Sequence, residues 1–299
     1  MKAKISKEHL LLIDDCYRNP KTSTLTFCFE PESYEPIITR LRNTKITHSS
    51  IEGKDLYLLD RFFSSSESEE LRVFSQTASF SRNSYGSTEA IQKGERPARS
   101  MNGQERWQFF SNPPKAIVEV QKLLSTLSAK LDARITTLPW ELCDESTGSP
   151  AVIANWLEEM SEESSDHGKH RDCNPSSKIS FGIPILYEEG KTHGPQFSNG
   201  ALGKPWLISL MLYVTAPNFK PEYQMGTTFY DESNQAPVRV DSQHMRLVLF
   251  ESDLLHSIEA SKIPAGISTW RLSYVFKLIV NPRKENTRVK EGLRSFLIE

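Results

Sequence analysis

Four residues in the second half of the chain have the types and the spacing of a metal and anion site: His170, Asp172, His256 and Arg271. His170 and Asp172 form an H-x-D pair, and residues two apart in an extended segment face the same side, so an imidazole and a carboxylate can bind one ion. His256 follows the apolar run 247–250 in a strand-turn-strand context. Two imidazoles and one carboxylate that leave the other coordination positions open form the ligand set of non-haem Fe(II) centres. The sequence therefore predicts a metal site formed by these three residues.

Arg271 belongs to an alternating stretch, residues 270–276, which predicts a strand. Because side chains two apart in a strand lie on the same face, Arg271 and Ser273 are expected to point the same way. An arginine donates two parallel hydrogen bonds to a carboxylate, and a neighbouring hydroxyl adds a further donor. We therefore expect Arg271 and Ser273 to bind an anion. A salt bridge at a strand edge is the alternative role for Arg271.

Other histidines near the motif are expected to have no part in the metal site. The H-x-D spacing alone is also compatible with a solvated loop, because the chain contains seven histidines. His167 is followed two residues later by Lys169, so it has no carboxylate partner. His193 lies in the polar, Gly-rich loop 188–205, and a fourth protein ligand would close the open positions of the ion. The order of the strands that follow favours the H-x-D pair over the loop interpretation.

The elements that must position these residues are mainly strands. Apolar or alternating runs predict strands at residues 56–63, 151–157, 179–187, 207–214, 226–230, 245–251, 256–259 and 270–276. Before them, a short helix near 7–17, a strand at 22–29 and a helical piece over 34–42 are expected.

Two longer helices are expected between the first two of these strands. Ser66 and Glu69 have the spacing of a capping box, which predicts a helix start there. After Pro113-Pro114, apolar residues recur at intervals of three and four: Ile117, Val120, Leu124, Leu127 and Leu131. This stripe predicts a helix that packs against the back of the strands.

The composition restricts the class of protein. The 299 residues are enough for one large or two small domains with a sizeable core. The chain has 36 Lys and Arg residues and 38 Asp and Glu residues. This balance gives no strong electrostatic field that would favour nucleic acid or a membrane surface as a partner. Four cysteines without C-x-x-C spacing argue against a zinc site or a disulfide scaffold, and a cytoplasmic setting is expected. The N-terminal apolar run, 10–13, is too short for a secretory signal or a transmembrane span.

The order of these features resembles that of the 2-oxoglutarate- and Fe(II)-dependent dioxygenases, particularly the prolyl-4-hydroxylase-like branch. The shared features are the H-x-D pair, the segment 226–230 before a polar turn, the strand 245–251, His256 and the strand that carries Arg271. The resemblance implies an α+β, mainly β fold with a double-stranded β-helix (jelly-roll) core and supporting helices. Residues 1–53 are then expected to form an N-terminal extension packed on the core. Residues 54–299 are expected to form the dioxygenase domain, with the jelly-roll core at about 150–282.

The resemblance also implies roles for the site residues. His170, Asp172 and His256 would hold Fe(II), and the 1-carboxylate and 2-keto oxygen of 2-oxoglutarate would take two of the remaining positions. The far carboxylate would bind Arg271 and Ser273, O2 would take the last position, and ascorbate would be a supporting reductant. The implied reaction hydroxylates a substrate C–H bond and releases succinate and CO2. An aspartate at position 172 leaves no vacancy for chloride, which disfavours a halogenase.

A tyrosine in this family often helps to hold the far carboxylate, and two tyrosines compete for that role. Tyr213 lies in an apolar-Tyr-apolar strand that leads to the glycine turn, whereas Tyr187 is closer in sequence to Asp172. Tyr213 is preferred, and residues 188–205 are then part of an inserted hairpin. The sequence departs from its relatives at Met225-Gly226-Thr227, where they often carry two glycines.

Three classes of function fit these features. The favoured class is an oxygenase that acts on a protein, peptide or amino-acid-like substrate. An oxygenase of the same chemistry that acts on nucleic acid or a small molecule is second. The charge balance argues against nucleic acid, because the basic cluster is confined to 283–290, which is expected to cap the barrel as a solvated helix. The third class is a jelly-roll binding protein without catalysis, against which the Arg271-x-Ser273 pair counts. The polar loop 79–105 is expected to be a solvated loop or a flap on the substrate side.

Overall fold

The computed structural model of the chain describes residues 29, 31–78, 109, 112–137, 169–172, 199–231, 233 and 237–298. It also describes the backbone of Cys28 and of five short strands: β4 (Ser81–Arg82), β5 (Arg99–Ser100), β7 (Val152–Leu157), β8 (Ile179–Ser180) and β9 (Gln196–Phe197). The predicted helix near 7–17 and most of the predicted loop 79–105 lie outside the described residues.

Two antiparallel sheets form the core of the described fold. The larger sheet has the strand order β2-β3-β13-β10-β15-β7-β5-β4, with β1 and β6 joined at its side. The smaller sheet has the order β12-β11-β14, and a bridge between His170 and His256 adds the His170 segment to the edge of β14. The strands not yet given bounds are β1 (Cys28–Phe29), β2 (Lys45–Ile51), β3 (Lys54–Asp60), β6 (Ala133–Thr137), β10 (Trp206–Thr215), β11 (Thr227–Tyr230), β12 (Val238–Val240), β13 (Leu247–Glu251), β14 (Leu255–Ile258) and β15 (Arg271–Pro282). The helices are α2 (Glu35–Arg42), α3 (Ser65–Thr77), α6 (Lys115–Lys130), η3 (Pro221–Tyr223) and α7 (Val289–Ile298).

From β7 onward the chain alternates between the two sheets. β7, β10, β13 and β15 belong to the larger sheet, and the His170 segment, β11 with β12, and β14 come between them in the smaller one. Antiparallel strands that alternate in this way between two facing sheets are the wiring of a jelly roll. The predicted fold class, mainly β with a jelly-roll core and supporting helices, is confirmed.

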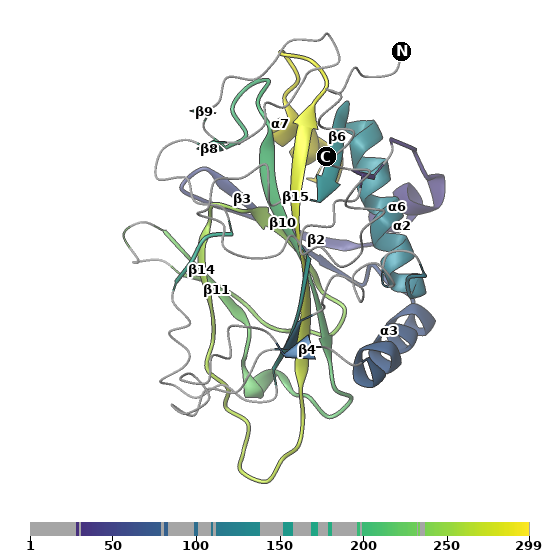
Figure 1. Ribbon diagram of the computed structural model, residues 1–299, viewed down its shortest axis with the longest axis vertical. Helices are drawn as coiled ribbons and strands as arrows, with labels where there is room; N and C mark the ends of the chain where they lie inside the picture. Colours follow the sequence, from purple (N-terminus) through teal and green to yellow (C-terminus); the bar gives the residue numbers. More distant parts are fainter. Residues whose placement is uncertain are drawn as a thin grey trace.

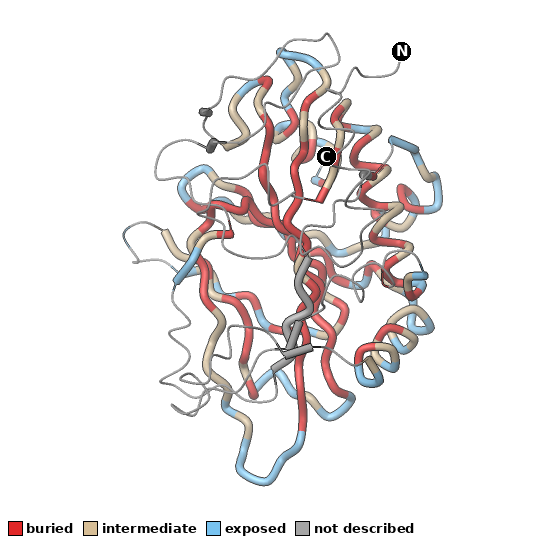
Figure 2. Tube along the Cα trace, in the orientation of Figure 1, coloured by how far each residue is buried: buried red, intermediate tan, exposed pale blue. Residues whose placement is uncertain are grey.

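The long strands β10 and β15 are buried along their length, and Figure 2 shows them as a continuous buried path through the molecule. Leu210 and Leu212 belong to the core cluster that includes the helices, whereas Met211 and Tyr213 belong to a second cluster shared with the smaller sheet. The two-residue period of a strand produces this alternation, and burial of both faces explains the continuous apolar run in the sequence. We call the space between the two sheets the barrel interior.

The register between β10 and β15 decides which polar side chains enter the barrel interior. Tyr213 lies opposite Ser273, and Ser209 lies opposite Lys277. Directly opposed residues of an antiparallel pair share a face, so Ser273 and Lys277 lie on the interior side with Tyr213 and Ser209. Arg271 follows on the same side by the period of two.

Helices cover the face of the larger sheet that is turned away from the smaller sheet. In Figure 1, α2, α3 and α6 lie on one side of β10 and β15, and β11 and β14 lie on the other. The predicted stripe of α6 is buried in the core shared with these strands: Ile117, Val120, Leu124, Leu127 and Leu131. The predicted helix and its supporting role are therefore confirmed.

The start of α3 differs from the prediction by two residues. The capping box is formed by Ser64 and Glu67, not by Ser66 and Glu69. Glu67 accepts a hydrogen bond from the backbone N–H of Ser64 at 2.8 Å, and it also pairs with Arg40 of α2 at 2.8 Å. Both serine-glutamate pairs have the same spacing, and the ion pair to α2 distinguishes the one that is used.

The described part of the predicted N-terminal extension shares the larger sheet. β2 pairs with β3 from Lys45 opposite Asp60 to Ile51 opposite Lys54. The predicted boundary near residue 54 therefore falls at the tight turn of this hairpin. The division into extension and catalytic domain remains a prediction.

The prediction of a solvated helix over 283–290 is wrong: the C-terminal helix, α7, begins only at Val289, and buried carboxylates anchor it. Lys290 Nζ lies 2.5 Å from Glu251 Oε1, and Arg294 donates to Asp55 Oδ1 at 2.8 Å. The same oxygen of Glu251 accepts the backbone N–H of Asp55 at 2.8 Å. Burial raises the pKa of Glu251, and the neighbouring Lys290 ammonium opposes that shift. None of the helices in the described part of the chain is both long and apolar enough to cross a bilayer.

The anchoring of α7 leads to a prediction about stability. Replacing Lys290 by Met removes the cation that faces the buried carboxylate of Glu251, and an unpaired buried charge is strongly destabilising. We expect the free energy of unfolding to fall by about 2 kcal/mol, below the range for fully buried pairs because the Lys290 side chain is 18% exposed. Arg288→Met is the control, since its ion pair with Glu291 is exposed and should contribute less than about 0.5 kcal/mol. Urea unfolding measures both variants, and equal losses would contradict the anchoring role.

Candidate metal centre

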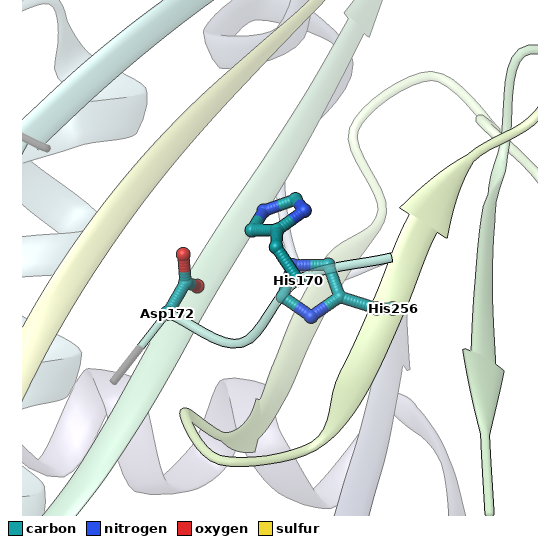
Figure 3. Close-up of side chains that lie close together, drawn as sticks. All are labelled: His170, Asp172 and His256. Carbon is teal, nitrogen blue, oxygen red and sulfur yellow. The ribbon is translucent and has the colours of Figure 1, made fainter. Parts of the chain in front are cut away.

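The structure brings His170, Asp172 and His256 together at one end of the barrel interior. One potential ligand atom from each of the three side chains lies within 4.8 Å of the other two. Figure 3 shows His256 on its strand and the other two side chains on the adjoining segment. His256 and Asp172 are buried, whereas His170 is exposed. The cluster therefore has one side toward solvent and one side toward the core.

Backbone pairing fixes the two imidazoles next to each other. The N–H of His170 donates to the carbonyl of His256 at 2.9 Å, and the N–H of His256 donates to the carbonyl of His170 at 2.9 Å. Such a doubly hydrogen-bonded antiparallel pair places the two side chains on the same face. Their ring centroids are 4.3 Å apart. The H-x-D segment thus acts as one more strand of the smaller sheet.

The ring of His256 has one nitrogen occupied and the other directed at the cluster. Its Nδ1 donates to the carbonyl of Leu254 at 2.9 Å, which fixes the tautomer and leaves Nε2 as the ring nitrogen that could bind a metal. The rings of Phe229 and Phe250 pack against it, with centroids at 5.6 and 5.1 Å. Burial lowers the pKa of His256 to about 4, although the charge of Asp172 raises it. The imidazole is therefore neutral at physiological pH, as a metal ligand must be.

Each oxygen of Asp172 has a partner on the larger sheet. Ser209 donates to Oδ2 at 2.6 Å, and Lys277 Nζ lies 3.1 Å from Oδ1. Burial raises the pKa of this carboxyl, but the Lys277 ammonium, with further contributions from the two histidines and Ser209, holds the pKa well below its ordinary value. Asp172 is therefore charged throughout the physiological range.

The turn from β13 to β14 connects the ligands to the rest of the fold. Ser252 shares a hydrogen bond with Ser209 at 2.9 Å, and Ser209 holds Asp172. The carbonyl of Asp253 accepts Arg171 Nε at 3.2 Å, between the two ligands of the H-x-D segment. The Asp253 carboxylate also pairs with Lys54 at 3.1 Å and accepts from Asn199 at 2.9 Å. One short turn therefore restrains both halves of the cluster.

Arg271 is a fully buried cation at the other end of the interior face of β15. Its Nε donates to the carbonyl of Met225 at 3.0 Å, and a terminal nitrogen donates to Ser273 Oγ at 2.7 Å. No carboxylate among the described residues pairs with it, so the predicted strand-edge salt bridge is not what the structure has there. A buried guanidinium without a counter-ion is costly, and an anionic ligand is the physical remedy.

Tyr213 stands beside this arginine. Its ring centroid is 5.4 Å from the Arg271 guanidinium carbon, and its hydroxyl shares a hydrogen bond with Thr227 at 2.5 Å. Tyr187, the competing tyrosine, lies outside the described residues, as do His167 and His193.

Backbone strain accompanies the carbonyl that faces Arg271. Met225 has φ +59, in the left-handed region that glycine adopts more readily than other residues. A glycine would adopt this φ with less strain than a methionine, so the conformation favours glycine at this position. Gly226 is required by space, because a Cβ there would lie 2.3 Å from the carbonyl oxygen of Val240.

Sequence reasoning missed three polar residues that support Asp172: Ser209, Ser252 and Lys277. Ser209 and Lys277 each lie between apolar neighbours in their strands, and Ser252 directly follows β13. A polar group within a buried strand costs free energy unless it has a partner, so this interruption was the available signal.

Comparisons with known proteins add similarities of structure. No family model matches the sequence, and no curated protein matches it. The chain is similar to a prolyl-4-hydroxylase from Pseudomonas putida, with 11% identity over 83% of this chain and 98% of that chain and a TM-score of 0.32. A structure of prolyl 4-hydroxylases from Phytophthora capsici gives 18% identity over 86% and 69%, with a TM-score of 0.39. The prolyl hydroxylase of Trichoplax adhaerens, solved with a hypoxia inducible factor peptide fragment, gives 13% identity over 95% and 96%, with a TM-score of 0.33. Identities this low leave the function to be inferred from the side chains of the site itself.

Proposed function

We propose that the chain is an Fe(II)- and 2-oxoglutarate-dependent dioxygenase that hydroxylates a C–H bond of a protein, peptide or amino-acid-like substrate. The observation that carries the proposal is the joint placement, on one barrel interior, of the His-Asp-His cluster and of buried Arg271. Neither feature alone is specific to this chemistry. Together they provide a metal-binding end and an anion-binding end on the same interior, which a chelating keto acid with a second carboxylate requires.

The donor set fits a ferrous ion. His170, Asp172 and His256 offer two neutral nitrogen donors and one oxygen donor, and this combination on one face of an ion is typical of non-haem Fe(II) oxygenases. When bound, Fe(II) supplies the activation of O2 that couples conversion of 2-oxoglutarate to succinate and CO2 with hydroxylation of the substrate. Three protein donors would suffice, because they would leave coordination positions open for other ligands.

The protein's own groups orient the cosubstrate. Arg271 binds its far carboxylate by charge-assisted hydrogen bonds, with Ser273 as an added donor. Tyr213 packs against the guanidinium and fixes its position. Because Arg271 is fully buried, water does not screen its ion pair with the far carboxylate. A dicarboxylate long enough to reach from the metal to Arg271 is therefore preferred over a monocarboxylate.

The exposure of His170 supports a substrate that approaches from the solvent side. His256 and Asp172 are buried and His170 is exposed, so a metal held by these three side chains would lie at the boundary between core and solvent. A site of this kind is accessible to a side chain on a peptide or protein surface as well as to a free amino acid. The proposal of a protein, peptide or amino-acid-like substrate rests on this opening and on the resemblance to the prolyl-4-hydroxylase-like branch.

The metal and cosubstrate assignment is tested by anaerobic absorption spectroscopy. Addition of Fe(II) and then 2-oxoglutarate to metal-free protein is expected to produce a weak visible charge-transfer band, because the keto acid chelates the ferrous ion. Asp172→Ala should abolish the band, since it removes the anionic ligand. Asp241→Ala, whose carboxylate is 57% exposed, should retain it. A folded, iron-supplied wild type without the band would instead favour a jelly-roll binding protein.

The role of Arg271 is tested by steady-state kinetics. Arg271→Ala removes a charged hydrogen-bonding group, and the loss of even one such bond costs about 1.5–3 kcal/mol, so the 2-oxoglutarate requirement should rise by at least roughly 10- to 200-fold. Arg271→Lys keeps the charge but loses the two-pronged geometry and should give a smaller rise. Succinate production as a function of 2-oxoglutarate concentration measures both variants. An unchanged requirement in Arg271→Ala would remove this residue from the cosubstrate site.

A further inference from the structure

We propose that Lys277 is a positioning residue that couples metal binding to keto-acid binding. The ammonium of Lys277, paired with Asp172, lowers the affinity of the three predicted ligands for a divalent metal alone. The same charge favours binding of the metal together with an anionic chelator. This inference rests on the proposed function, because it assumes that the same three side chains bind the metal.

The contact that suggests this role is a buried ion pair with a predicted metal ligand. Lys277 Nζ lies 3.1 Å from Asp172 Oδ1, and the two side chains are 3% and 6% exposed. Ser209, opposite Lys277 in the register of β10 and β15, donates to the other carboxylate oxygen at 2.6 Å. The larger sheet therefore holds this carboxylate from two adjacent strands, one with a charged donor and one with a neutral donor.

The position of Lys277 makes an incidental pairing a poor explanation. Lys277 lies between Phe276 and Leu278, which are both buried in the helix-side core. A lysine at such a position costs free energy through desolvation, and an apolar residue of similar volume is often equally or more stabilising. A structural role alone does not require an ammonium group there, so an effect on the charge of the site is the more specific explanation.

The charge of the site follows from these contacts. With both imidazoles neutral, as ligation requires, the carboxylate charge of Asp172 and the ammonium charge of Lys277 cancel. Counted over the described residues, the site therefore offers an entering divalent cation no net negative charge, and the fixed ammonium repels that cation. Burial keeps this repulsion largely unscreened by salt.

A chelating keto acid reverses this effect. Its carboxylate brings negative charge to the metal and is attracted by Lys277 as well as by the ion. The metal and the chelator therefore strengthen each other's binding, and the strengthening is reciprocal because it is a coupling free energy. With Arg271 on the same interior face of β15, the dicarboxylate binds between two buried cations.

The test compares Co(II) binding with and without N-oxalylglycine, an unreactive analogue of 2-oxoglutarate, by anaerobic calorimetry. Lys277→Gln keeps a hydrogen-bond donor for Asp172 but removes the charge, and Lys277→Arg keeps the charge. In wild type, the analogue should tighten Co(II) binding by at least about tenfold. In Lys277→Gln, Co(II) alone should bind about tenfold more tightly and the gain from the analogue should shrink. Lys277→Arg should resemble wild type.

The outcomes separate this inference from the proposed function. Failure of wild type to bind Co(II) even in the presence of N-oxalylglycine would overturn the proposed function and this inference with it. Binding of both ligands by wild type, with an unchanged gain in Lys277→Gln, would overturn the coupling role alone.

A measurement on wild type alone keeps the inference testable if Lys277→Gln does not fold. The rise in Tm caused by Co(II) and the analogue together should exceed the sum of the separate rises, because each ligand then strengthens the other. Simply additive rises would contradict the coupling.

Discussion

The antiparallel pairing of β10 with β15 aligns the polar side chains that these two strands contribute to the candidate site. Its register places Ser209 opposite Lys277 at the metal end and Tyr213 opposite Ser273 near the anion end. Both strands are buried on both faces, so a shift of one residue would turn every interior polar group toward the helices. The apolar contacts with α6 and with the smaller sheet fix this register. The contacts that fold the barrel therefore also fix the two buried cations in place. Lys277 lies beside Asp172, and Arg271 lies beside the carbonyl of Met225.

The turn from β13 to β14 links the metal centre to distant parts of the chain. Glu251 binds the backbone of Asp55 and the ammonium of Lys290, while Asp253 binds Lys54. Directly after Asp253, the carbonyl of Leu254 fixes the tautomer of His256. The N-terminal hairpin and the C-terminal helix thus restrain the segment that carries a predicted ligand. This arrangement explains why Asp55, Lys290 and Lys54 make polar contacts with buried carboxylates away from the three predicted ligands. Their contacts hold the turn from β13 to β14 in place.

The features that the sequence predicts correctly depend on local periodicity or on spacing within one strand. The apolar stripe of α6, the strands predicted at 207–214, 226–230, 245–251 and 270–276, and the interior pairing of Arg271 with Ser273 follow from periods of 3.6 and 2. The predicted start of α3 is two residues too late, because two serine-glutamate pairs share one spacing and only the contact of Glu67 with Arg40 in α2 decides between them. The support of Asp172 by Ser209 and Lys277 could not be predicted, since it depends on the register between strands far apart in the sequence.

An anaerobic crystal structure with Co(II) and N-oxalylglycine, with the metal located by its anomalous signal, is the decisive test of the proposed site. We expect one metal peak bonded to His170, Asp172 and His256 Nε2, chelated by the analogue. The far carboxylate of the analogue should lie within hydrogen-bonding distance of Arg271 and Ser273. A metal bound elsewhere, or an analogue bound away from Arg271, would contradict the proposed metal and cosubstrate site.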